Sequence, residues 1–74
     1  MRYADVILPL PLADSFTYRI PDDLEPVVVP GCRVVVLFGK KRYYTALVLR
    51  LRDEAPEGAG EIKDIYHILD ADPV

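Results

Sequence analysis

The clearest structural signal in this chain is RVVVLFGKKRYYTALVLRL, residues 33–51. Its two apolar runs, residues 33–38 and 43–51, are rich in valine, leucine and tyrosine, and such clusters favour strands. Between them, residues 39–42 have the length of a hairpin loop, in which Gly39 supplies a position that tolerates a positive φ. The stretch therefore predicts a β-hairpin with a positively charged tip.

Two further strands are predicted on the N-terminal side of this hairpin. Residues 15–20 (SFTYRI) alternate between apolar and polar side chains, which is the pattern of a short, half-buried strand. Residues 2–8 alternate only roughly and lead into Pro9, which cannot donate to a strand ladder. A strand at 2–8 is therefore expected either to lie at a sheet edge or to end before the proline.

The remaining segments predict turns and one more strand. Residues 21–26 indicate a loop or a single helical turn, residues 30–31 a tight turn, and residues 53–60 (DEAPEGAG) an acidic, mobile connection. Residues 62–69 (IKDIYHIL) fit a helix by the spacing of their apolar positions and a strand by their isoleucine and tyrosine content. We favour the strand.

These patterns predict one mainly β domain over residues 1–74. About five to six short strands are expected to form a small antiparallel barrel or rolled sheet, OB-like and of OB or SH3 size. A chain of 74 residues can hold one small core and a shallow surface site, but hardly a deep catalytic cavity.

Several classes of function find no support. Cys32 is the only cysteine, which excludes an internal disulfide or a cysteine-based zinc site and fits a reduced compartment. The N-terminus does not resemble a secretory signal, and no apolar run approaches the roughly 20 residues that span a membrane. No Ser/His/Asp or Cys/His arrangement stands out. We expect a cytoplasmic domain without a membrane partner and without enzymatic activity of its own.

The charge is unevenly distributed. A formal net charge of −3 argues against broad, unspecific binding to nucleic acid, because such binding needs many phosphate-neutralising cations. Residues 33–52 nevertheless carry six cations and no anion, whereas residues 53–74 carry one cation and seven anions. The middle of the chain is therefore a local positive region.

Three segments together resemble a known family. They are LPLPLADSFTYRIP (residues 8–21), PGCRVVVLFGKKRYYTALV (residues 30–48) and EIKDIYHILDADPV (residues 61–74). In order and spacing they are similar to the N-terminal domain of the PriA-type primosomal replication-restart helicases (primosomal protein N-prime). That domain has a proline-rich entry, a Phe-x-Tyr strand, a Gly-x-Arg-Val-x-Val-x-Phe-Gly run and a closing Ile-Lys segment. The resemblance covers nearly the whole chain.

The resemblance implies a DNA-binding module that recognises the 3′-OH end of a nascent leading strand at a stalled replication fork, independently of base sequence. The implied partners are single-stranded or forked DNA with a free 3′ end, other domains of the same helicase, and replication-restart proteins. The whole family protein is an ATP-dependent 3′–5′ DNA helicase. This chain has no Walker A loop, so the resemblance places ATP, Mg²⁺ and structural zinc in other domains, with no cofactor in this one.

The family's pocket for the terminal nucleotide falls on Phe16, Thr17, Gly39 and Lys63 of this sequence. The resemblance implies that Phe16 stacks on the last base, that Gly39 lets the backbone approach it, and that Lys63 neutralises a phosphate. The family frequently has aspartate where this chain has Thr17. A threonine hydroxyl can still accept a hydrogen bond from the terminal 3′-hydroxyl, but it carries no charge to repel a 3′-phosphate.

Each of these features also has a simpler interpretation. Phe16 alternates like a core residue, and Lys63 alone would be an ordinary surface lysine. The cations Lys40, Lys41 and Arg42 are either a solvated loop tip or auxiliary contacts to the DNA backbone. The rival function is a protein-interaction module that docks other domains or replication partners through its strand edges or its acidic loop.

Overall fold

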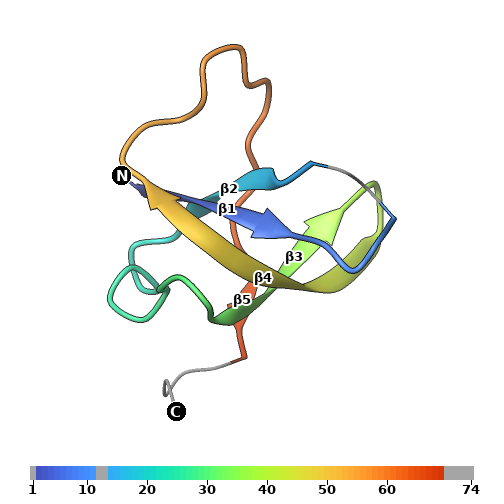
Figure 1. The fold of residues 1–74 in the computed structure, drawn as a ribbon, viewed down its shortest axis with the longest axis horizontal. Coiled ribbons are helices and arrows are strands. Elements are labelled where there is room, and N and C mark those ends of the chain that lie inside the picture. Colours follow the sequence, from blue (N-terminus) through green and yellow to red (C-terminus); the bar gives the residue numbers. More distant parts are fainter. Residues whose placement is uncertain (1, 12–13, 70–74) are drawn as a thin grey trace.

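The computed structural model describes residues 2–11 and 14–69, whose strands form one antiparallel sheet (Figure 1). The strands are β1 (Arg2–Ile7), β2 (Phe16–Ile20), β3 (Arg33–Phe38), β4 (Arg42–Arg52) and β5 (His67–Ile68). Their order across the sheet is β2-β1-β4-β3-β5. The predicted mainly β class and antiparallel pairing are confirmed. The end of the third family-like segment, residues 70–74, lies outside the described residues.

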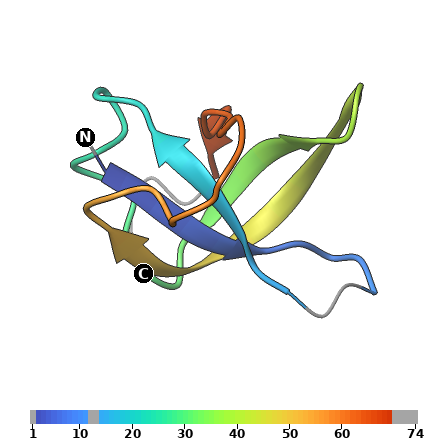
Figure 2. The same cartoon turned by 90° about the horizontal axis from the view of Figure 1, so that it is seen from above.

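The predicted hairpin is formed by β3 and β4. Val34 pairs with Ala46 and Phe38 pairs with Arg42, so that residues 39–41 make the loop. Gly39 has a φ of +79°, a left-handed conformation that a residue with a Cβ adopts only under strain. The tip of this hairpin projects from the body of the sheet, as the green-to-yellow ribbon of Figure 2 shows.

The N-terminal strand is an interior strand. β1 lies between β2 and β4 and ends at Ile7, just before Pro9. Of the two outcomes that the proline allowed, an edge position or an early end, the early end is observed. The register with β4 shifts between Asp5 and Val6, and an irregularity of this kind bends a strand and increases its twist.

Residues 61–69, which follow the acidic loop, cross from one edge of the sheet to the other, and we call them the crossing segment. Arg19 of β2 donates its backbone N–H to Lys63 O and accepts a bond from Ile65 N–H, both at 2.9 Å. The next residue, Tyr66, donates to Val35 O of β3 at 2.9 Å, and the chain then pairs with β3 as β5. Because the segment changes partner midway, the predicted strand is reduced to the two residues of β5, and the helical alternative is wrong.

The sheet remains open. β2 and β5 stand at the two ends of the strand order, and the crossing segment meets β2 through one isolated parallel bridge, Arg19 to Asp64. Of the two predicted arrangements, a barrel or a rolled sheet, the barrel is therefore wrong, because a single bridge does not continue the strand ladder around the sheet. The acidic connection before this segment, residues 53–60, is a loop that arches away from the sheet (Figure 1).

The hydrophobic core covers one face of the sheet. Its buried side chains alternate along the strands, namely Ala4 and Val6 of β1, Tyr18 and Ile20 of β2, Val34 and Val36 of β3, and Ala46 and Val48 of β4. Ile65 and Ile68 of the crossing segment and Val28 add to this core, and Cys32 is buried as predicted. Full burial of each larger aliphatic side chain contributes about 1.5–3 kcal/mol relative to exposure. Within the described ranges, no helix has the length and apolar character needed to cross a bilayer.

Candidate functional site

A small pocket lies between the edge strand β2 and the end of β3. Its volume is about 250 Å³. Three separate segments line it: Phe16, Thr17 and Tyr18 of β2, then Leu37, Phe38 and Gly39 at the end of β3, and Glu61 and Lys63 of the crossing segment. We call it the edge pocket. It exists because the crossing segment lies against β2 and so carries Lys63 to the end of the hairpin.

All four residues predicted to hold a terminal nucleotide line this pocket, namely Phe16, Thr17, Gly39 and Lys63. The three cations of residues 40–42 do not line it. They are exposed on the hairpin tip, directly after Gly39 in the chain. The structure thus brings the predicted site residues together from distant parts of the sequence, with the cationic tip beside them.

Phe16 forms one wall of the pocket together with Phe38. Their ring centroids are 5.0 Å apart in an edge-to-face arrangement with an interplanar angle of 68°. Phe38 makes a second edge contact with Tyr44, at 6.3 Å. Phe16 is half-buried, packs against the core and also lines the pocket, so its ring belongs to the core and to the pocket wall at once. The ring is therefore held in place by packing before any ligand arrives.

Tyr18 closes the inner side of the pocket. Its side chain is buried, and its hydroxyl donates a 2.9 Å hydrogen bond to Leu37 O of β3. Burial raises the pKa of the Tyr18 phenol above its usual value, which keeps it a neutral donor. The interpretation of the sequence gave no site role to Tyr18, Leu37, Phe38 or Glu61. Their position next to, or two residues from, a predicted site residue was the available signal.

Lys63 and Gly39 are in direct contact. Lys63 Nζ donates to Gly39 O at 3.1 Å in an exposed position. An ammonium group has three N–H donors, so two remain for oxygens of a ligand. A Cβ built on Gly39 would meet no protein atom within 4 Å, which means that the space beside this residue is open.

Thr17 belongs to a polar network on the outer face of the sheet. Its Oγ1 donates a 2.6 Å hydrogen bond to Asp5 Oδ1, and Asp5 Oδ2 accepts from Nε of Arg50 and Arg52 at 2.7 and 2.8 Å. Asp5 is only 1% exposed. Burial by itself would raise the pKa of the Asp5 carboxyl, but the hydrogen bonds from Thr17, Arg52 and Arg50 outweigh it and hold the pKa below its usual value. Asp5 is therefore a buried, fully compensated carboxylate.

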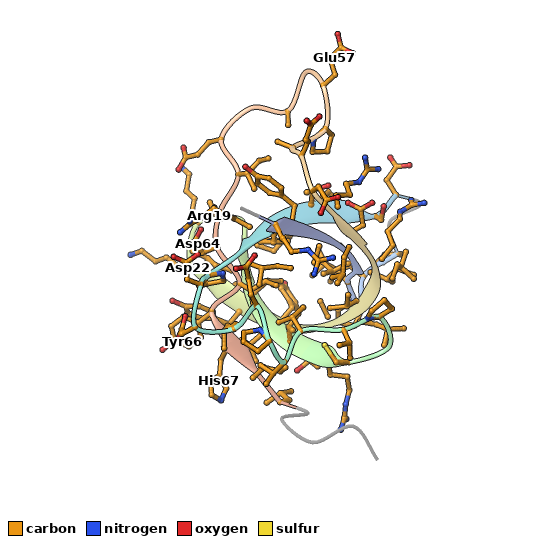
Figure 3. The ribbon with its side chains drawn as sticks, turned by 90° about the vertical axis from the view of Figure 1, so that its left-hand side faces the viewer. Arg19, Asp22, Glu57, Asp64, Tyr66 and His67 are labelled. Carbon is orange, nitrogen blue, oxygen red and sulfur yellow. The ribbon has the colours of Figure 1, made fainter. Side chains whose placement is uncertain are left out.

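The crossing segment is fastened to β2 by an ion pair. Arg19 Nε and a terminal guanidinium nitrogen donate to the two carboxylate oxygens of Asp64 at 2.5 and 2.6 Å, and Figure 3 shows the two side chains together. Hydrogen bonds from Arg19 lower the pKa of Asp64. This pair flanks Lys63 and holds its backbone beside the pocket. In the part of the chain that the structure describes, no three His, Cys, Asp or Glu side chains gather as a metal site requires.

Comparison with known proteins identifies the family of this chain. The family model of the PriA 3′DNA-binding domain (3′BD) matches residues 5–74. The replication restart protein PriA of Bacillus subtilis (strain 168) is 29% identical over 77 residues, which cover 100% of this chain and 9% of that protein. The chain thus spans a small part of the length of this relative. It belongs to the PriA 3′DNA-binding domain family.

Proposed function

We propose that the edge pocket holds the 3′-terminal nucleotide of a DNA strand, largely independently of which base it carries. The observation that supports this most directly is the convergence of Phe16, Thr17, Gly39 and Lys63 on one small pocket. Its volume of about 250 Å³ is below the roughly 300–1,000 Å³ of drug-sized pockets. Such a pocket suits one nucleotide better than a longer strand.

The chemistry of the walls supports end recognition without base selection. The ring of Phe16 can stack on any base, because every base has a π face. The free donors of Lys63 can bind a phosphate oxygen. The hydroxyl hydrogen of Thr17 is committed to Asp5, so its oxygen offers only lone pairs to a ligand, and a terminal 3′-hydroxyl could donate to it.

The proposal extends to the protein of which such a domain is part. We propose that the domain itself catalyses nothing and takes no cofactor, and that it holds the nascent leading strand at stalled forks for an ATP-dependent 3′–5′ helicase. ATP, Mg²⁺ and structural zinc would bind other domains of that helicase. The open sheet would present a surface to the DNA strand end, as the sheet of an OB-fold does for oligonucleotides. Lys40, Lys41 and Arg42 would attract the DNA backbone from the hairpin tip.

Titration of fluorescent single strands tests the proposal. We expect a strand with a free 3′-OH to bind more tightly than one with a blocked 3′ end, and a closed circular strand to bind least. Phe16→Ala should weaken binding by about 1–3 kcal/mol if the base stacks on the ring. Lys63→Ala should weaken it and lower the salt dependence by about one counterion.

Two controls make the experiment decisive. Leu47→Ala changes an exposed side chain of β4 that does not line the edge pocket, and it should leave DNA binding unchanged. Circular dichroism and urea unfolding show that the Phe16 and Lys63 variants still fold. Equal binding of free, blocked and circular strands by the wild-type domain would refute end recognition.

A second candidate function, protein docking, is favoured by an apolar hollow on the sheet. Ile7 of β1 opposes Leu47 of β4, and the two side chains are 45% and 43% exposed. With Pro9 and Thr45 they border a hollow of about 250 Å³. This surface would contact other domains of the helicase or replication-restart proteins. Binding of such a partner, abolished by Leu47→Asp and accompanied by no DNA binding, would favour this function over the first.

A further inference from the structure

A second hollow adjoins the edge pocket. It has a volume of about 550 Å³ and lies between the start of β4 and the crossing segment. Leu37, Glu61 and Lys63 line both hollows. A strand whose last nucleotide sits in the edge pocket can therefore continue past Lys63 directly into the second hollow.

Two exposed tyrosines mark this second hollow. Tyr43 is the second residue of β4 and Tyr66 lies in the crossing segment. Their ring centroids are 4.7 Å apart at an angle of 48°. The side chains are 54% and 67% exposed. Figure 3 shows Tyr66 at the outer side of the molecule, on the same side as Asp64. We call this ring pair the tyrosine shelf. It leaves aromatic surface in water, which is what a base needs for stacking.

The charges around the tyrosine shelf suit a phosphodiester chain. Lys63 stands in the wall between the two hollows and has unused N–H donors, and Arg42 directly precedes Tyr43. Asp64 also lines the second hollow, but Arg19 pairs with both of its oxygens. Of the two carboxylates in this lining, Asp64 and Glu61, that of Asp64 is therefore already compensated by a cation.

We infer that the tyrosine shelf stacks the base that precedes the terminal nucleotide, with the phosphate that joins the last two nucleotides beside Lys63. This inference rests on the proposed function, because the edge pocket must first hold the strand end. It makes the binding site two nucleotides long. It also gives a role to Tyr43 and Tyr66, whose rings contact each other but remain largely exposed to solvent.

Fluorescence of 2-aminopurine tests the shelf directly, because its emission falls when it stacks on an aromatic ring. We place it at the penultimate position of a short single strand with a free 3′-OH and titrate the domain into it. Quenching on binding is expected for the wild type. It should be lost in Tyr43→Ala/Tyr66→Ala and kept in Tyr43→Phe/Tyr66→Phe, which retains both rings.

The affinity gives a second readout. An abasic site at the penultimate position should weaken wild-type binding by about fivefold or more and should have no effect in the double alanine variant. The same abasic penalty in both proteins would overturn the shelf, even if a free 3′-OH remained preferred over a blocked end. Loss of that preference in the wild type would instead refute the proposed function. Both tyrosines are largely exposed, so we expect the variants to fold, and urea unfolding checks this.

Discussion

Thr17 donates a 2.6 Å hydrogen bond to Asp5, which lies directly opposite it in the β1–β2 pair. Arg50 and Arg52 of β4 complete the set of donors around the Asp5 carboxylate. A residue of the proposed DNA site is thereby coupled to a buried charge on the sheet. Because of this coupling, a substitution at position 17 changes the stability of the domain as well as its proposed DNA site. The sequence of β2 alone does not reveal it.

Thr17→Asp is the first informative substitution. The sequence predicts that a carboxylate here raises the preference for a 3′-OH over a 3′-phosphate, because it repels a phosphorylated end. The structure adds that this carboxylate would face Asp5 in place of a hydrogen-bond donor. We therefore also expect a loss of about 1–3 kcal/mol in the free energy of unfolding, measured in urea.

A double variant that moves the negative charge from position 5 to position 17 provides the control for this substitution. In Asp5→Asn/Thr17→Asp, the carboxylate moves to the other side of the same hydrogen bond and the like-charge contact disappears. Much of the lost stability should return. If Thr17→Asp alone is as stable as the wild type, the Thr17–Asp5 contact does not constrain this site.

Stability at acidic pH should depend on Asp5. The native pKa of Asp5 is lowered, so the unfolded chain binds this proton more readily than the native protein does. The stabilisation is therefore complete above the unfolded pKa of about 4 and is lost as pH falls through the native pKa. Asp5→Asn should flatten the decline of the urea midpoint below about pH 4. Asp64 also has a lowered pKa, so part of the decline should persist.

Asp53→Asn is the matched control for the pH experiment. Asp53 is an exposed residue whose contact with Arg2 is 3.7 Å long, and surface pairs of this kind contribute little. Its removal should leave unchanged the decline of the urea midpoint at acidic pH. An equal effect of the two substitutions would contradict the special role of Asp5.

Gly39 can be tested against a second glycine of the same conformation. Gly39 has φ +79° and Gly58 has φ +78°, and neither has a protein atom within 4 Å of an added Cβ. Alanine should therefore cost about 1–2 kcal/mol of stability at either position, through backbone strain alone. Only Gly39→Ala should also weaken binding of 3′-OH strands, because its methyl group would stand in the edge pocket. Equal DNA affinities for the two variants would remove Gly39 from the site.

Glu61 is expected to contribute to the choice of strand end. It lines the edge pocket, and its carboxylate would repel the extra charge of a 3′-phosphate. Glu61→Gln should therefore reduce the preference for 3′-OH over 3′-phosphate by about two- to fivefold, the size of an exposed charge interaction. Glu57→Gln is the control, since Glu57 lies at the tip of the acidic loop, away from the sheet (Figure 3). An unchanged preference in Glu61→Gln would show that its charge does not reach the strand end.

Most of the strands could be predicted because their information is local. The alternation of residues 15–20 and the two apolar runs of the hairpin set β2, β3 and β4 within a few residues of their observed ends. The crossing segment was harder to predict, since its hydrogen bonds go to β2 first and to β3 afterwards. A segment that satisfies two partners in turn need not keep the period of two that marks a strand, and the apolar spacing of residues 62–69 fits a helix although the segment is extended.

The grouping of the site residues came from the family resemblance and not from periodicity. Phe16 and Lys63 lie at opposite ends of the chain, and only the ordered crossing segment brings them to one pocket. Asp5 was missed altogether. Its partner Arg50 is 45 positions away, and no local pattern marks a carboxylate that will be covered by arginines from another strand.

Local sequence is sufficient to predict the hairpin, its glycine turn and the alternating faces of β2, because these depend on neighbouring residues and on the period of two. Tertiary structure alone decided that the sheet stays open, that Asp5 is buried and compensated, and that Tyr43 meets Tyr66 beside the edge pocket. Each of these features depends on side chains that become neighbours only after the strand order and the crossing of the last segment are set.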